Sequence, residues 1–303
     1  MSHREHVIPF TDVMKGVGLH RRQQDLSSYE YSYLAEITNV YPLTEKERLY
    51  QIQIIDPVER SRFFFRPGQF VMLELPGIGE APFSISSSPI RRGDLELCIR
   101  AVGNLTNFLS RAGRGTQVGL SGPFGTSFPV EEMQGSDVLL IAGGLGIVPL
   151  RAPLFTVLEN RSRYRRVDLI YGAKRPAELL FTYQYESWQR FDVNLEITVD
   201  QPDPDWQGQV GLITNLLKQR IEAGGSMARN THAIVCGPPV MFKYVCNMLT
   251  EAGLPMQRMF VSLERRMHCG RGKCCRCNVG STYTCMKGPV FDYWSVMNLE
   301  EAI

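Results

Sequence analysis

The feature that most constrains this chain is a cysteine-rich run near its C-terminal end, MHCGRGKCCRCNVGSTYTC. Five of the eight cysteines fall between residues 269 and 285. Four of them form C-x4-C-x2-C followed eight positions later by one more: Cys269, Cys274, Cys277 and Cys285. Cysteines this close together are poorly placed for disulfides and well placed to act as ligands in a reducing compartment. The run therefore predicts a metal centre.

The spacing favours an iron–sulfur cluster, with 2Fe-2S as the predicted type. The intervals C-x4-C-x2-C are those of plant-type 2Fe-2S centres, whereas zinc ribbons usually combine two C-x2-C knuckles. Gly270, Gly272 and Gly280 suit a loop around a cluster, because glycine permits the tight turns that aim backbone N–H groups at sulfur. A structural zinc site is the alternative. Cys275 is expected to point away from the ligands.

Composition and charge exclude little, but they set the scale of the molecule. A chain of 303 residues with 44% hydrophobic content has enough apolar material for two domains and a tail. A net charge of +2 gives no reason to expect nucleic acid or an anionic membrane as partner. The apolar stretch 138–150 is shorter than the ~20 residues of a membrane span. With no signal-peptide pattern in MSHREHVIPF, a cytoplasmic location is expected.

The hydrophobic pattern divides the chain into four segments. Residues 1–30 lack steady periodicity and are predicted to form an N-terminal arm. From 31 to 133, short β-type runs separated by turn residues predict a small antiparallel β-barrel. From 134 to 257, strands alternate with helical stretches, which predicts a parallel α/β sheet. Residues 258–303 form a tail too short for its own core, which a cluster would stabilise.

A glycine-rich turn in the α/β segment indicates a nucleotide site. The run IAGGLGIVPL follows a strand and leads into a helix, so Gly143, Gly144 and Gly146 are placed to present backbone N–H groups to a pyrophosphate. The turn does not match the GxGxxG fingerprint, and similar turns also serve packing. The pattern alone leaves both interpretations open.

Two motifs in the barrel segment are candidates for a flavin site. The run APFSISSSP puts polar residues beside an aromatic ring on one strand, where an isoalloxazine could be seated: Pro82, Phe83, Ser84, Ile85 and Ser86. Further along, IRAVGNLTNFL supplies an arginine and a threonine-capped helix N-terminus suited to phosphates, through Arg100, Gly103 and Thr106. An ordinary barrel strand with serines facing solvent is the alternative.

Taken in order, these motifs resemble the ferredoxin–NADP reductase superfamily. The tail pattern M-x-C-G-x-G-x-C-x-x-C…C-x-x-G-P-V-F, from Met267 to Phe291, is similar to the electron-transfer subunit of dihydroorotate dehydrogenase. It is also similar to the gamma subunits of cytoplasmic nickel–iron hydrogenases (sulfhydrogenases) and to the flavin subunit of anaerobic sulfite reductase. The segment EAPFSISSSP is most similar to the hydrogenase group. The resemblance covers residues 33–292.

The resemblance implies FAD, NAD(P)H and particular binding residues. FAD would lie on the motif matched by residues 82–86, with its phosphates near the positions matched by Cys98, Ile99, Arg100, Leu105 and Thr106. The nicotinamide nucleotide would meet Gly143, Gly144, Leu145, Gly146 and Ile147, and beside it would lie the motif matched by Cys236, Gly237, Pro238, Pro239 and Met241. The superfamily's R-x-Y-S is Ala81-Pro82-Phe83-Ser84 here, without the arginine and tyrosine. The choice of FAD over FMN therefore rests on the resemblance.

Discrimination between NADH and NADPH depends on the side chains near the ribose 2′ position, a carboxylate for the hydroxyl or a cation for the phosphate. Lys174 and Arg175 follow one predicted strand and favour NADPH. Asp200 ends the next strand and would favour NADH. Each of the three is also compatible with a solvated surface charge, so the choice stays open.

These features predict an electron-transfer flavoprotein subunit that moves electrons between NAD(P)H and an iron–sulfur or catalytic partner, through FAD and a 2Fe-2S cluster. A nickel–iron hydrogenase or a sulfur-reducing complex is the expected assembly. No side chain is expected to act as acid or base, because the cofactors carry the chemistry. The alternatives are a stand-alone ferredoxin or flavodoxin reductase and a non-catalytic redox sensor with zinc in its tail. The direction of electron flow is open.

Overall fold

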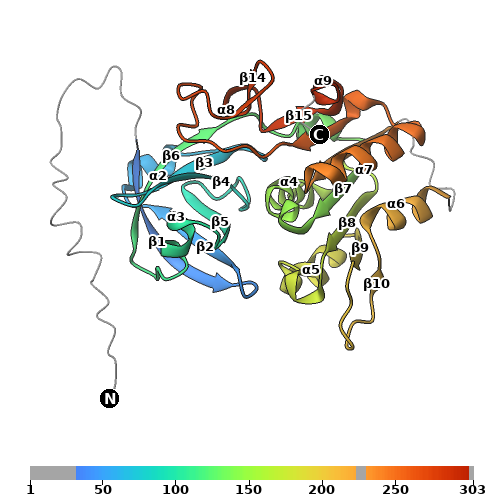
Figure 1. The fold of residues 1–303 in the computed structure, drawn as a ribbon, viewed down its shortest axis with the longest axis horizontal. Coiled ribbons are helices and arrows are strands. Elements are labelled where there is room, and N and C mark those ends of the chain that lie inside the picture. The colour runs from blue at the N-terminus through green and yellow to red at the C-terminus, as the bar shows by residue number, and fades with distance from the viewer. Residues whose placement is uncertain (1–31, 223–229, 300–303) are drawn as a thin grey trace.

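The computed structural model describes residues 32–222 and 230–299, and the predicted arm 1–30 lies outside the described residues. The described chain forms a six-stranded sheet, a seven-stranded sheet and a small two-stranded sheet. Figure 1 shows the six-stranded sheet on the left and the seven-stranded sheet with its helices on the right. A β-barrel followed by an α/β domain confirms the predicted fold class.

The six-stranded sheet is antiparallel throughout and curls into a barrel. Its order is β4-β3-β6-β1-β2-β5. The edge strands β4 and β5 come together just beyond the end of β4, where Ser86 N donates to Glu96 O at 2.9 Å. Side chains alternate between the interior and the outside, as in β2, whose Tyr50, Ile52 and Ile54 lie in the barrel core. The strands are β1 Tyr33–Pro42, β2 Glu47–Ile54, β3 Phe70–Leu75, β4 Gly79–Ser84, β5 Asp94–Arg100 and β6 Gln117–Phe124, and the helices are α2 Pro57–Arg62 and α3 Asn104–Leu109.

The seven-stranded sheet is parallel except at one edge, with the order β10-β9-β8-β7-β11-β12-β15. Its central strands are buried along their whole length, as in β8, because helices cover both faces. The strands are β7 Asp137–Gly143, β8 Val167–Ala173, β9 Val193–Val199, β10 Gln209–Val210, β11 Thr231–Cys236, β12 Met259–Ser262 and β15 Val290–Asp292. The helices are α4 Ile147–Glu159, α5 Tyr185–Arg190, α6 Ile213–Glu222, α7 Pro239–Glu251 and α9 Tyr293–Val296.

The tail is attached to both domains. Its cysteine loop contains β13 Asn278–Val279, β14 Thr282–Tyr283 and α8 Thr284–Lys287. On the barrel side, Thr126 donates from its backbone N–H to Gly288 O at 2.6 Å and from its hydroxyl to Val290 O at 2.7 Å. On the other side, β15 pairs antiparallel with β12. The expected boundary at 257/258 therefore does not coincide with the edge of the seven-stranded sheet, since β12 and β15 both belong to it.

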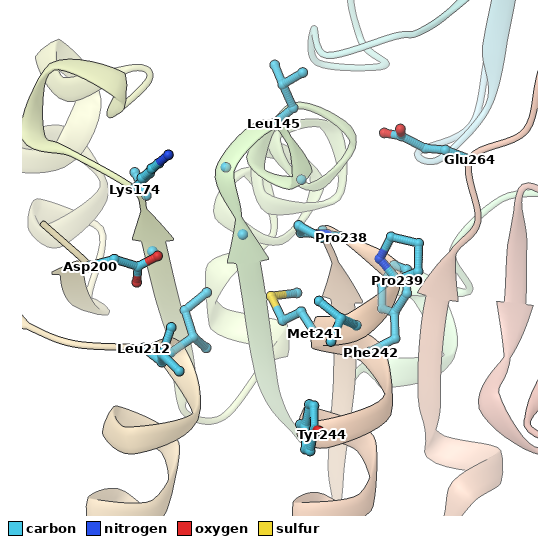
Figure 2. A pocket seen from close by; sticks show the side chains of 18 of the residues that line it. Leu145, Lys174, Asp200, Leu212, Pro238, Pro239, Met241, Phe242, Tyr244 and Glu264 are labelled. Carbon is cyan, nitrogen blue, oxygen red and sulfur yellow. The ribbon is translucent and has the colours of Figure 1, made fainter. Parts of the chain in front are cut away.

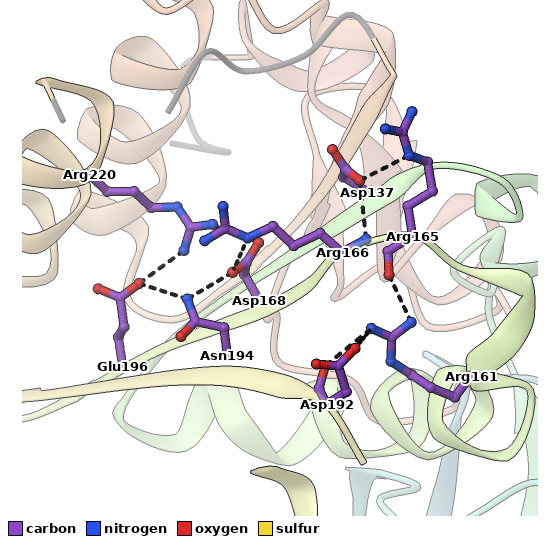
Figure 3. A network of polar contacts seen from close by, with 9 residues as sticks. All are labelled: Asp137, Arg161, Arg165, Arg166, Asp168, Asp192, Asn194, Glu196 and Arg220. Carbon is purple, nitrogen blue, oxygen red and sulfur yellow. Dashed lines mark hydrogen bonds and ion pairs between the residues drawn. The ribbon is translucent and has the colours of Figure 1, made fainter. Parts of the chain in front are cut away.

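A polar network lies at the amino ends of the parallel strands (Figure 3). Asp168, near the start of β8, is bound by Arg220 at 2.6 Å and by Arg166 at 2.9 Å. Arg220 also reaches Glu196 on β9 at 3.0 Å. These contacts all lie within one domain and join α6 to the sheet, at the edge of the strands opposite their carboxyl ends.

Candidate functional site

A cavity of about 690 Å³ opens at the carboxyl ends of the parallel strands. The strand order reverses between β7 and β11, because β8 and β9 lie on one side of β7 and β12 lies beyond β11. Open α/β sheets bind ligands at such a reversal. The cavity is large enough for part of a dinucleotide.

The cavity brings together most of the residues predicted to meet the nicotinamide nucleotide. Figure 2 shows Leu145 above it, Lys174 and Asp200 on one side, and Pro238 and Met241 on the other. The lining residues predicted from the sequence are Gly143, Gly144, Leu145, Gly146, Lys174, Asp200, Gly237, Pro238, Pro239 and Met241, and Arg100 joins them from the barrel.

In the loop after β7, glycine is required at Gly146 and at Gly144 for different physical reasons. A Cβ on Gly146 would lie 2.0 Å from Cys236 O, so the loop after β7 packs directly on the loop after β11. Gly144 has φ +54° and nothing within 4 Å of its Cβ position, so its backbone is open to the cavity. The first glycine sets the distance between two loops, and the second leaves room for a ligand to approach the backbone.

Three predicted nucleotide residues do not line the cavity. Ile147 is fully buried at the start of α4. Cys236 is 1% exposed, and burial raises the pKa of its thiol, so it is a buried thiol behind the loop. Arg175 donates from Nε to Gln201 Oε1 at 3.1 Å. Lys174 is therefore the predicted cation that lies at the cavity, close enough to Asp200 to oppose the rise that burial gives to the pKa of that carboxyl.

The predicted flavin strand is split between open and buried positions. Pro82, Phe83 and Ser84 are half-buried on the edge strand β4. Ile85 lies in the barrel core with no exposed surface. Ser86 is also fully buried, and its hydroxyl donates to Glu96 O at 2.9 Å. Residues 82–84 are thus partly accessible to a ligand, although Phe83 also packs against the barrel core, whereas the side chains of residues 85 and 86 serve the barrel.

The second predicted flavin segment runs along β5 and into α3. Burial raises the pKa of the Cys98 thiol to about 12, and Ile99 and Leu105 are also buried. Gly103 is the N-cap of α3, and Thr106 Oγ1 accepts from the backbone N–H groups of Val102 and Gly103 at 2.9 Å each. The threonine thus braces the turn before the helix from its third position, instead of acting as the N-cap.

Arg100 is the point at which the flavin segment meets the nucleotide cavity. Its Nε is paired with Glu47, a carboxylate on β2 that is 3% exposed. Glu47 was missed by sequence reasoning, because no local pattern links it to a residue on another strand. The pair holds the guanidinium at the rim of the cavity.

Glu264 is a second residue that the sequence reasoning missed. It follows β12 and lines the same cavity, with its carboxylate directed toward the loop at Leu145 (Figure 2). Its side chain keeps contact with solvent, yet the surrounding protein raises its pKa by desolvation, with Arg100 acting in the opposite direction. The available clue was its place three residues before the Met267 that opens the cysteine motif.

The cysteine loop directs backbone N–H groups at its sulfur atoms. Gly272 N donates to Cys285 Sγ at 3.0 Å. Cys269 Sγ accepts from three backbone N–H groups at 3.3 to 3.4 Å, those of Arg271, Lys273 and Cys274. Such contacts stabilise thiolates and tune clusters. The predicted glycine turns are present, because Gly270, Gly272 and Gly280 have φ of +67°, +73° and +54°.

The close spacing of the cysteines affects how readily their thiols ionise. Partial burial opposes ionisation, yet the N–H donors lower the pKa of Cys269 to about 7. Burial, followed by the neighbouring Cys277, raises the pKa of Cys285 to about 12. Thiols this crowded ionise together only when a cation offsets their charge.

The loop's packing separates ligand candidates from a spectator. Cys277 and Cys285 pack with Phe70 and Met72 of the barrel. Cys275 is exposed in a left-handed conformation with φ +56°, and its sulfur accepts from the Tyr283 hydroxyl at 3.2 Å. No three His, Cys, Asp or Glu side chains in the described ranges are arranged to hold a single metal ion. The prediction of an iron–sulfur cluster therefore rests on the cysteine sulfurs and on the N–H···S contacts, both of which suit a cluster.

Comparison with known families divides the chain in the same way as its structure. An oxidoreductase FAD-binding domain matches residues 35–128. An oxidoreductase NAD-binding domain matches residues 140–247. The iron–sulfur cluster binding domain of dihydroorotate dehydrogenase B matches residues 264–297. Fold, cavity and cysteine loop thus define a flavin- and nicotinamide-dependent oxidoreductase with an iron–sulfur domain.

Curated relatives specify the branch. The gamma subunit of sulfhydrogenase 1 from Pyrococcus furiosus is 40% identical over 270 residues, which cover 87% of this chain and 91% of the relative. A probable dihydroorotate dehydrogenase B electron transfer subunit from Methanocaldococcus jannaschii is 35% identical over 232 residues, 76% of this chain and 80% of the relative. The chain belongs to the ferredoxin–NADP reductase family, in the branch of sulfhydrogenase gamma subunits and dihydroorotate dehydrogenase electron transfer subunits.

Solved structures agree on the fold. The structure of an NADH-dependent reduced ferredoxin-NADP oxidoreductase aligns with a TM-score of 0.68 and 22% identity, over 87% of this chain and 91% of that one. A ferredoxin NADP+ reductase from Neisseria gonorrhoeae with bound FAD and NADP aligns with a TM-score of 0.64 and 22% identity, over 76% and 97%. No helix in the described parts of the chain is long and apolar enough to cross a membrane.

Proposed function

We propose that this chain is the electron-transfer subunit of a cytoplasmic nickel–iron hydrogenase or sulfur-reducing complex, moving electrons between NAD(P)H and a partner subunit with FAD and a 2Fe-2S cluster as carriers. The observation that carries the proposal is the cysteine loop seated on the barrel of a chain that also has a nucleotide cavity. Sulfhydrogenase gamma subunits are similar over most of their length. The cysteine content of the loop suits a reducing compartment.

Bound FAD supplies the chemistry of accepting an electron pair and releasing electrons singly, as a cluster requires. The side chains position the carriers. Lys174 and Asp200 would lie near the ribose of a bound nucleotide. Arg100 and the half-buried residues 82–84 of β4 would hold the flavin, and the backbone of the cysteine loop would stabilise the thiolates. Lys174 favours NADPH in this arrangement, because it is the predicted cation that faces the cavity.

The surface around the cluster supports a protein partner with an acidic face. Between residues 265 and 287 the chain has six lysines and arginines and no acidic residue, although its total charge is only +2. Arg266, Arg276 and Lys287 are exposed there, and Met286 beside Cys285 is 54% exposed. Positive charge around an electron exit attracts an acidic partner from a distance set by ionic strength.

Anaerobic purification from the native host tests the function. We expect one flavin and one 2Fe-2S centre per chain, an EPR signal from the reduced cluster, loss of visible absorbance on addition of NADPH, and hydrogenase or sulfur-reductase subunits in the same fraction by mass spectrometry. A colourless protein that contains zinc would contradict the proposal. A chain that purifies alone with both carriers would favour the stand-alone reductase.

The charge of the exit surface has its own test with two small acceptors of opposite charge. With rising salt, reduction of ferricyanide should slow and reduction of hexaammineruthenium(III) should not. Arg276→Glu combined with Lys287→Glu leaves four cations and two carboxylates between residues 265 and 287 and should weaken the salt dependence of ferricyanide reduction. Arg190→Glu, on α5 away from the tail, is the matched control (Figure 1). Equal salt dependence in both variants would remove the electrostatic argument.

A further inference from the structure

One buried arginine connects the two domains. Arg151 lies on α4, about one helical turn beyond the nucleotide loop, and is 3% exposed. Its Nη1 donates to Glu96 Oε2 at 2.5 Å and to Ser86 O at 3.2 Å. Both acceptors belong to the barrel, one on β5 and one just beyond the flavin strand β4.

The nucleotide domain encloses the same guanidinium. Gln184 Oε1 accepts from Arg151 Nε at 2.9 Å. The rings of Phe155 and Phe181 lie 4.7 and 4.6 Å from the guanidinium carbon. Phe181 has a left-handed backbone conformation with φ +57°, which costs free energy for a non-glycine residue. The side chains of the nucleotide domain thus cover the guanidinium, and one of them belongs to a residue with a strained backbone.

Glu96, like Arg151, is buried and has several polar partners. It is 7% exposed, and its second carboxylate oxygen accepts from Gln51 Nε2 at 3.1 Å and meets Arg91 at 3.5 Å. Burial favours the neutral acid, but Arg151, helped by Gln51 and Arg91, outweighs it and lowers the pKa of Glu96, so the pair is ionised at neutral pH. Buried ion pairs add little net stability compared with apolar side chains of similar volume. The hydrogen-bond geometry of this pair therefore says more about its role than its contribution to the free energy of unfolding does.

Apolar contacts and a second cavity surround the ion pair at the interface between the domains. Ala152 of α4 packs into the barrel core on one side. On the other side a cavity of about 730 Å³ lies between the domains, and Arg151 and Glu96 themselves line it together with Tyr41, Phe155 and Tyr183. Apolar packing also joins the domains, because Leu49 and Cys98 of the barrel belong to the same core cluster as Leu150 of α4. Such packing is not directional, whereas the hydrogen bonds of the guanidinium are, so they can set the orientation of α4.

We propose that Arg151 and Glu96 are positioning residues that hold the nucleotide loop against the flavin strand, so that the nicotinamide meets the flavin at reaction distance. This rests on the proposed function of the two sites. Neither residue lines the nucleotide cavity. The pair acts through α4, whose first turn carries the loop 143–147, and through Ser86, which follows the strand that bears Pro82 to Ser84. Misplacement by about 1 Å can slow a reaction about a hundredfold.

The test measures flavin reduction by NADPH after rapid anaerobic mixing, using the full chain loaded with FAD. Arg151→Met combined with Glu96→Leu removes the tether without leaving an unpaired charge. We expect the rate at saturating NADPH to fall about tenfold or more, while FAD content and the Kd for NADPH stay within a factor of about two. Arg151→Lys should recover part of the rate.

Arg220→Met is the matched control. It removes an arginine from a largely buried ion pair within a single domain and leaves Asp168 with other partners (Figure 3). It should lower the unfolding temperature and leave flavin reduction unchanged. If the double variant does not fold, Glu96→Gln is measured in its place; it keeps the shape of the side chain and a hydrogen-bond acceptor but removes the charge, so it should lower the rate by a smaller factor.

Two outcomes would overturn the inference. One is a wild-type rate in the folded, FAD-loaded double variant, and the other is a rate loss no larger than the control's at an equal loss of stability. The proposed function is judged separately, since it fails if NADPH and NADH both leave the flavin of the wild-type chain oxidised.

Discussion

Gly146→Ala should damage nucleotide binding although alanine suits the local backbone. Gly146 has φ −59° and ψ −17°, the conformation of a helix, so backbone preference alone would make alanine stabilising by up to ~1 kcal/mol. The added Cβ, however, would lie 2.0 Å from Cys236 O, 2.3 Å from its carbonyl carbon and 2.7 Å from Gly237 N. All three are backbone atoms, which cannot rotate away as a side chain does.

The size of the effect follows from these distances. Ordinary contact requires the two loops to separate by about 1.5 Å. Forcing an extra methyl group into a packed site costs about 1–3 kcal/mol, which exceeds the gain in helix preference. The loops after β7 and β11 form adjacent walls of the cavity, so the same displacement should weaken NADPH binding about tenfold or more.

Calorimetric titration with NADP+ and thermal unfolding would measure the two effects. Gly135→Ala is the control, because this glycine lies at the other end of β7, has φ +74° and has nothing within 4 Å of its Cβ position. It should lose about 1 kcal/mol of stability from strain and bind NADP+ normally. Wild-type affinity and stability in Gly146→Ala would refute the close packing of the two loops.

Three further outcomes are expected. Cys275→Ser should leave the EPR signal of the cluster intact, because its sulfur faces the Tyr283 hydroxyl and solvent, whereas Cys274→Ser should abolish the signal. Lys174→Ala should weaken NADPH about tenfold while NADH binding changes little, since a charge-assisted hydrogen bond contributes ~1.5–3 kcal/mol; equal losses for both nucleotides would argue against a phosphate contact. The folded-state pKa of Glu96 is depressed below its ordinary 4.5, so its contribution to stability is complete above that value and is lost as the pH falls through the folded pKa; Glu96→Gln should therefore flatten the acid side of the stability curve measured by urea unfolding.

The fold could be predicted from the sequence because each domain has its own hydrophobic period. The short runs before residue 133 became β1 to β6, and the helical stretch ending at Glu159 became α4. The glycine turn and the C-G-P-P motif were placed at the carboxyl ends of neighbouring parallel strands, where the topology brings them together. The tail was harder to predict, because β15 comes from a segment with a dominant cysteine pattern and pairs with a strand nearly thirty residues earlier.

The candidate site was predictable where the pattern is local and not where it depends on tertiary contacts. Lys174 and Asp200 follow predicted strands, so both were expected at the same edge of the sheet. Glu47, Glu264 and Arg151 belong to the site or its support only because distant elements meet. A carboxylate on a barrel strand or an arginine inside an apolar helix has no sequence pattern that names its partner.

The short strand β15 covers an edge as well as anchoring a loop. It occupies the hydrogen-bonding side of β12 that would otherwise be the open edge of the seven-stranded sheet. Unpaired strand edges invite pairing with other chains. The segment that carries the cysteine loop therefore also closes this edge of the sheet against pairing with other chains, and the Thr126 hydroxyl holds its Val290 from the barrel side.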